Sequence, residues 1–136
     1  MDTYTVDASA VLVYLVDALP PAADDIFSRA EAGEAVLELP AMAAVETLYR
    51  AAKGVNVRGS TLSVDPADLH AGFDTFLPVT VVDDRDSLLN AVVPLMDPFP
   101  NQMHDAMILA SHHDRDTDAV VTADSKWTDH AETIWD

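Results

Sequence analysis

Short runs of apolar residues alternate along this chain with longer segments whose apolar positions recur every three or four residues. The short runs are typical of buried strands, and the periodic segments are typical of helices that pack on them. The runs predict strands at residues 3–6, 35–39, 79–82 and 119–122, with a short edge strand at 134–135. The periodic segments predict helices at residues 10–15, 21–33, 41–53, 66–76, 87–93 and 102–112.

The order of these elements predicts the fold class. Strands and helices alternate, and the strands are continuous apolar runs, as in a parallel sheet that is covered on both faces. Residues 55–64 are polar and contain glycine, which predicts a mobile loop. No repeat, low-complexity tract or linker divides the chain. We therefore expect one three-layer α/β/α domain over residues 1–136, with four or five parallel strands.

The helix at residues 41–53 carries the first informative acid. Its predicted apolar stripe is Met42, Val45, Leu48, Tyr49 and Ala52, and Gly54 ends it. Glu46 falls at the edge of this stripe, and burying a carboxylate is costly unless it is paired or bound to a metal. A Glu that merely reaches out to solvent from the rim of the stripe is the alternative.

Three further acids fall where the predicted elements end or begin. Asp7 follows the first strand, Asp124 follows the fourth, and Asp105 lies in the first turn of the helix at residues 102–112. Ligands of open parallel sheets bind outside the carboxyl ends of the strands. Ser9 is predicted to cap the first helix and can also face a ligand. The plain alternative is that Asp7 only ends a strand and Ser9 only caps a helix.

Carboxylates gathered in one cleft repel one another unless a cation is present. Oxygen ligands of this kind select Mg²⁺ or Mn²⁺ over softer metals. Such an ion can activate water and stabilise an attack on a phosphodiester. If the four acids converge, the sequence predicts a metal-dependent hydrolase of phosphodiesters.

The order of these residues resembles the PIN domain and, more narrowly, the VapC-type toxins of toxin–antitoxin pairs. The resemblance covers nearly the whole chain and rests on four motifs: Val6-Asp7-x-Ser9, Glu46 in a mid-chain helix, the segment from His104 to Ala110, and Val121-Thr122-x-Asp124. It implies a Rossmann-like sheet and a Mg²⁺- or Mn²⁺-dependent ribonuclease. It also implies a protein that is commonly a homodimer and is inhibited by a cognate antitoxin.

The same resemblance assigns roles to residues. Its four catalytic and metal-binding acids match Asp7, Glu46, Asp105 and Asp124, with Ser9 and Thr122 as supporting hydroxyls. The family usually has an aromatic residue soon after the last acid, and Trp127 would have to serve for it here. The group from His112 to Asp118 is interpreted as a solvated helix end and turn rather than a metal site.

The composition is strongly acidic, with 24 Asp and Glu residues against 7 Lys and Arg residues and a net charge of −17. Such an excess is typical of halophilic proteins, whose carboxylate surface stays hydrated in concentrated salt; it bears on solubility rather than on fold. The chain has no cysteine, which excludes disulfides and thiolate chemistry. It shows neither an apolar run of membrane-spanning length nor a signal peptide, so a cytoplasmic protein is expected.

An RNA-binding site on so acidic a protein has to be locally basic. Four of the seven basic residues follow the motif acids closely, and we predict that they bind RNA: Arg50, Lys53, Arg58 and Lys126. In molar salt the Debye length is about 3 Å, so distant acids repel RNA little. The rival interpretation is a PIN-like protein-binding module with little catalysis, whose acidic surface meets a basic partner. A phosphoacceptor receiver domain ranks third, because it needs paired acids after the first strand and only Asp7 is present there.

The charge excess predicts a dependence of stability on salt. Self-repulsion among the acids opposes compaction, so the melting temperature should fall in dilute buffer and recover with added salt or divalent cation. Thermal melts from dilute buffer to molar salt check this expectation. An unchanged melting temperature would contradict the halophilic interpretation.

Overall fold

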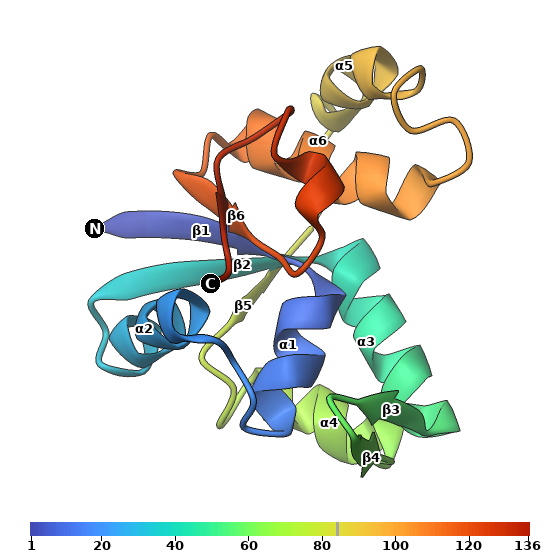
Figure 1. The fold of residues 1–136 in the computed structure, drawn as a ribbon. Helices are drawn as coiled ribbons and strands as arrows, with labels where there is room; N and C mark the ends of the chain where they lie inside the picture. Colours follow the sequence, from blue (N-terminus) through green and yellow to red (C-terminus); the bar gives the residue numbers. More distant parts are fainter. Residues whose placement is uncertain (84) are drawn as a thin grey trace.

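A five-stranded parallel sheet forms the centre of the molecule in the computed structural model, which describes residues 1–83 and 85–136 (Figure 1). Across the sheet the strands follow the order β5 (Thr80–Val82), β2 (Ala35–Pro40), β1 (Asp2–Val6), β6 (Ala119–Val121) and β7 (Thr133–Ile134). Every neighbouring pair is parallel. The predicted parallel sheet is confirmed, including its short fifth strand at the edge.

Helices cover both faces of this sheet (Figure 1). One face carries α1 (Ala8–Leu15) and α2 (Pro21–Glu31), and the other carries α6 (Met103–Arg115), against which α5 (Leu88–Val92) packs. The remaining helices are α3 (Ala41–Lys53), α4 (Pro66–Phe73) and the short 3₁₀ helices η1 (Val93–Leu95) and η2 (Ser125–Trp127). Among the residues described, no helix combines the length and apolar character that crossing a membrane requires.

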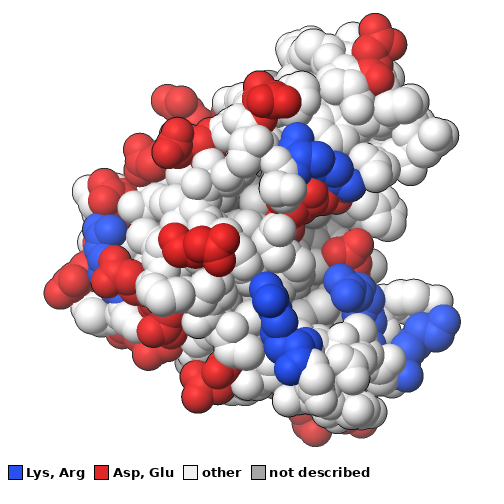
Figure 2. Space-filling model, viewed as in Figure 1, with Lys and Arg blue, Asp and Glu red and all other residues white. Residues whose placement is uncertain are grey.

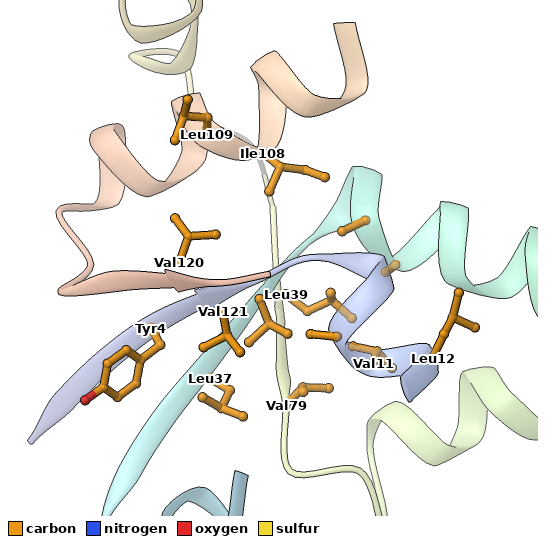
Figure 3. Packing of buried hydrophobic residues seen from close by; sticks show 14 of the residues in the cluster. Tyr4, Val11, Leu12, Leu37, Leu39, Val79, Ile108, Leu109, Val120 and Val121 are labelled. Atoms are coloured by element: carbon orange, nitrogen blue, oxygen red, sulfur yellow. The ribbon is translucent and has the colours of Figure 1, made fainter. Parts of the chain in front are cut away.

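Side chains of the central strands alternate between two apolar layers (Figure 3). Val120 points toward Ile108 and Leu109 of α6, whereas Val121 points to the opposite face of the sheet with Leu37. All five side chains are almost completely buried. The strands are therefore apolar at successive positions because both of their faces lie in the core, as the continuous runs predict.

The bounds of α3 agree with the prediction, but its buried face does not. Val45 and Tyr49 of the predicted stripe are each 61% exposed. The buried positions are small: Ala43, Ala44, Thr47 and Ala51. This helix contacts α1, α4 and α6, and small side chains allow such close approach. Thr47 fits there because its hydroxyl donates a 2.7 Å hydrogen bond to the Ala43 carbonyl oxygen.

The predicted loop at residues 55–64 is instead an antiparallel hairpin of β3 (Val55–Val57) and β4 (Ser60–Leu62). Its two central turn residues, Arg58 and Gly59, have φ angles of 52° and 86°. Positive φ at both positions is what the common two-residue hairpin turn requires. The hairpin was not predicted from this polar segment, because its turn depends on the backbone conformation of Arg58 and Gly59.

Two further expectations were wrong at helix ends. Phe76 lies beyond the end of α4 and is 64% exposed, although that helix was predicted to extend to it. His112 is buried rather than solvated, because α6 continues to Arg115. Its Nδ1 lies 2.7 Å from the Thr117 hydroxyl, which in turn lies 2.8 Å from the Thr5 hydroxyl. This buried polar chain links the end of α6 to β1.

Candidate active site

Four acidic side chains from four different elements line one pocket at the carboxyl edge of the central strands. The pocket has a volume of about 460 Å³. Its lining residues are Asp7, Ser9, Glu46, Arg50, Asp105, Ile108, Ala123, Asp124 and Ser125. The four predicted acids therefore share one cavity, together with one of the two predicted hydroxyls.

Strand register explains why Asp7 and the last motif meet. Val6 of β1 lies opposite Val121 of β6, so the residues that follow them leave the sheet side by side. The Thr122 hydroxyl donates a 2.5 Å hydrogen bond to Asp7 Oδ2. Thr122 is thus next to Asp7 because of the sheet, although 115 positions separate the two residues.

The other two acids come from helices on either side of this point. β2 pairs with β1 on the side opposite β6 and leads directly into α3, which carries Glu46. Asp105 lies in the first turn of α6, and α6 contacts both β1 and α3. The two helices therefore bring Glu46 and Asp105 to the same pocket.

The first helix begins earlier than predicted, and its cap is Asp7 rather than Ser9. Asp7 Oδ1 accepts a 3.0 Å hydrogen bond from the Ala10 backbone N–H, as an N-cap carboxylate does. Ser9 lies within the first turn and donates its hydroxyl to the same oxygen at 2.7 Å. The carboxylate of Asp7 is consequently fixed by three hydrogen bonds.

Both hydroxyls also accept hydrogen bonds from the backbone that leads to Asp124. The Ala123 N–H lies 3.4 Å from Ser9 Oγ, and the Asp124 N–H donates to Thr122 Oγ1 at 3.0 Å. Ser9 and Thr122 therefore join Asp7 to the segment that carries Asp124. Their contacts suit the supporting role that was predicted for them.

Burial raises the pKa of the Asp7 carboxyl to about 6, from an ordinary value of 3.8. Hydrogen bonds from Thr122, Ala10 and Ser9 oppose this rise, and the nearby negative charge of Glu46 adds to it. The ionised form of Asp7 is therefore costly in the protein alone. A cation in the pocket would offset that cost.

Glu46 lies at the edge of the pocket with a side chain that is 33% exposed. Its Oε1 is 3.8 Å from Nδ1 of His104, which is itself largely exposed. Glu46 therefore lines the pocket from α3, and its negative charge acts on Asp7.

One basic residue lies between two of the acids. The Lys126 ammonium is 3.1 Å from Asp105 Oδ2 and 3.1 Å from Asp124 Oδ2. Its hydrogen bond with Asp105, and then that with Asp124, raises the pKa of Lys126 above its ordinary value. Lys126 is close to the last motif in the sequence, but its contact with Asp105 could not be predicted, because Asp105 lies on another element.

The donor set suits a hard divalent cation. The four acids offer carboxylate oxygens, which Mg²⁺ and Mn²⁺ prefer, and a protein cation already lies between two of them. Among the described residues, however, no three His, Asp or Glu side chains are close enough together to hold an ion. Asp105 and Asp124 are paired with Lys126 instead, so binding an ion requires these side chains to turn.

Besides Lys126, the other three predicted RNA-binding residues occupy different settings. Arg50 lines the acidic pocket. Lys53 lies outside the lining, where its ammonium donates to the Tyr49 hydroxyl at 2.9 Å. The Arg58 guanidinium lies 5.7 Å from the centre of the Trp135 ring.

Figure 2 shows the charge distribution on this face of the molecule. Basic side chains lie on both sides of a hollow between α6 and α3, and acidic side chains lie within it. A second pocket of about 400 Å³, which includes Trp135, shares Ala123, Asp124 and Ser125 with the first. Neither the second pocket nor the Arg58–Trp135 contact was predicted, because both depend on residues far apart in the chain.

Trp127, the aromatic residue that follows the last acid, is fully buried in η2. Its indole Nε1 has no hydrogen-bond partner among the described residues. The side chain therefore anchors the segment after Asp124 by packing alone and does not reach the pocket.

The fold is similar to that of proteins of known structure, whereas no family model and no curated protein matches the sequence. A chain of VapBC2 from Rickettsia felis, crystallised with a DNA fragment from its promoter, is 13% identical, with a TM-score of 0.70 over 98% of this chain and 99% of that one. A chain of a toxin–antitoxin complex from Klebsiella pneumoniae is 11% identical, with a TM-score of 0.61 over 96% and 94%. At these identities the likeness is one of fold, and it confirms the predicted PIN-like architecture.

The raised pKa of Asp7 predicts the effect of replacing this residue. Asp7→Asn should leave the metal-free protein at pH 7 as stable as the wild type or more stable, by at most about 3 kcal/mol. The amide oxygen can accept from the Ala10 N–H, and the amide N–H₂ can donate to the Thr122 hydroxyl, so the cap is kept. If the chain is the ribonuclease that the resemblance implies, metal-dependent cleavage of RNA should also be lost.

The direction of this change in stability follows from the linkage between protonation of Asp7 and folding. Folded Asp7 holds its proton to about pH 6 and unfolded Asp7 only to about pH 4, so wild-type stability from this group falls as the pH rises through that window. The two proteins should therefore be alike below pH 4 and differ fully above pH 6. Urea denaturation with a chelator in high salt measures this, and Asp129→Asn on the surface is the charge-matched control. A loss of stability specific to Asp7→Asn at pH 7 would make the carboxylate structural.

Proposed function

We propose that this chain is a metal-dependent endoribonuclease that hydrolyses RNA phosphodiester bonds, and that it is the toxin of a toxin–antitoxin pair. One observation carries the proposal: four carboxylates from four elements line a single pocket at the carboxyl edge of a parallel sheet. Ionisation of Asp7 in this pocket is unfavourable for the protein alone, chiefly because the carboxyl is buried and to a lesser extent because Glu46 is negatively charged. It is favourable when the pocket receives a cation.

Mg²⁺ or Mn²⁺ would be held by Asp7, Glu46, Asp105 and Asp124. A bound ion of this kind supplies an activated water and stabilises the charge that develops on the attacked phosphate. The chain's own residues supply the geometry. Ser9 and Thr122 hold the Asp7 carboxylate in one orientation and connect it to the backbone before Asp124.

Arg50 is the basic residue best placed to meet the substrate. It lines the same pocket as the acids, and it follows Glu46 by one helical turn on α3. A guanidinium there can pair with a phosphate oxygen beside the scissile bond. Distant acids are screened in concentrated salt and therefore repel RNA little, which leaves local basic residues such as Arg50 to contact its phosphates.

Two observations support a toxin with a protein partner. The similar folds come from VapBC2 and from a toxin–antitoxin complex. In addition, large apolar side chains are exposed on α3 and around α5: Val45, Tyr49, Leu89, Val93 and Met96. Exposed apolar surface of this kind is typical of protein interfaces. We propose that it serves an antitoxin and a second copy of the chain in a homodimer.

The central test is cleavage of a defined RNA panel with and without Mn²⁺ in high salt. We expect cleavage by the wild type only with metal, and none by Asp124→Asn, which removes one ligand carboxylate together with its ion pair to Lys126. Asp129→Asn is the matched control and should cleave normally. If the wild type binds Mn²⁺ and RNA but cleaves nothing in the panel, the protein-binding module becomes the better proposal.

Arg50 and Lys53 separate phosphate binding from general charge effects. We expect Arg50→Gln to weaken RNA binding and to reduce the slope of log affinity against log salt by about one. Lys53→Gln should reduce it less, because this ammonium lies on Tyr49 outside the pocket. Metal affinity should be retained in both variants, since neither side chain offers a ligand oxygen.

Titration of labelled RNA at several salt concentrations, with Ca²⁺ in place of Mg²⁺ to suppress cleavage, measures these slopes. Equal slopes for the wild type and Arg50→Gln would show that Arg50 pairs only with protein acids.

A further inference from the structure

The ammonium of Lys126 lies between two of the acids that line the pocket. Its ammonium is equally distant, 3.1 Å, from an oxygen of Asp105 and an oxygen of Asp124. The two acids come from separate elements, the first turn of α6 and the start of η2. A single positive charge therefore holds together two of the four acidic residues of the pocket.

This contact is exchangeable. The side chain of Lys126 is 41% exposed, and those of Asp105 and Asp124 are 28% and 33% exposed. Ion pairs this open to solvent are weak. The backbone N–H of Lys126 makes a different bond, since it donates to the other oxygen of Asp124, Oδ1, at 3.1 Å. The ammonium can thus leave while the backbone of η2 stays in place.

The contact also accounts for the orientation of the two acidic side chains. Asp105 and Asp124 each turn an oxygen to Lys126, and no three acids among the described residues converge on one point. A divalent ion that uses both carboxylates would have to take the same space as the ammonium. The two cations would exclude each other by charge and by volume.

We propose that Lys126 is a resident counter-cation, which neutralises Asp105 and Asp124 in the metal-free protein and is displaced when a divalent ion binds. The proposal rests on the proposed function, since it assumes that the pocket takes a metal. It assigns Lys126 a positioning role: the ammonium keeps the two acids assembled before loading and lowers the apparent affinity for metal. Loading is then an exchange of one cation for another.

The sharpest test compares three single variants by calorimetric titration with Mn²⁺, using the full chain in high salt without RNA. Lys126→Met removes the charge and keeps most of the apolar stem, whereas Lys126→Arg keeps the charge. Lys53→Met is the matched control, because it makes the same change in net charge at a lysine that contacts Tyr49 outside the pocket.

We expect Lys126→Met to bind Mn²⁺ about tenfold more tightly, the factor that two exposed ion pairs of ordinary strength account for. Lys126→Arg should stay within about threefold of the wild type, and Lys53→Met should not change. A second readout is thermal melting with chelator. Lys126→Met should melt at a lower temperature than Lys53→Met, because its two acids are left to repel, and Mn²⁺ should remove that difference.

The outcomes distinguish this inference from the proposed function. If the wild type binds Mn²⁺ and Lys126→Met binds it equally or more weakly, the counter-cation role is wrong while the metal site stands. If neither protein binds Mn²⁺, the metal site itself is wrong, and Lys126 is a permanent partner of the two acids. A tenfold gain in both Lys126→Met and Lys126→Arg would show that side-chain packing, and not charge, controls access.

Discussion

The parallel pairing of β1 with β2 on one side and β6 on the other is the interaction on which the candidate site depends. It sets Val6 beside Val121, so that Asp7 and Thr122 emerge from the sheet in hydrogen-bonding contact. It also directs β2 into α3 and so brings Glu46 to the same edge. A register shift of one residue would turn every side chain of a strand to the other face and would separate these groups.

Bringing these negative charges together is unfavourable, and other groups of the molecule offset part of that free energy. Buried Asp7 is held by three hydrogen bonds, yet burial still raises its pKa. Asp105 and Asp124 are neutralised from within the chain by Lys126. The pocket is therefore assembled by hydrogen bonds on one side and by an ammonium on the other. This division suits a site whose final charge balance comes from a bound cation.

Much of the fold was determined by the sequence alone. Buried strands were recognisable as continuous apolar runs, and Pro40 and Gly54 marked the ends of the helix at residues 41–53. Strand ends also indicated Asp7 and Asp124, because ligands of parallel sheets meet the carboxyl ends of strands. These features are local, since a few neighbouring residues carry each of them. Glu46 was indicated by its place at the edge of a predicted apolar stripe and Asp105 by its place in a first helical turn, and the motif order then assigned both to one site.

Only the tertiary structure decided which surfaces pack and which charges meet. Close contact with three helices selects the alanine face of α3, so the larger Val45 and Tyr49 are left exposed. His112 is buried beside the hydroxyl of Thr117, which in turn contacts the hydroxyl of Thr5 on β1. Lys126 meets Asp105 across 21 positions of chain. Such contacts depend on how helices and strands pack against one another. The pattern of residues within a single element therefore does not predict them.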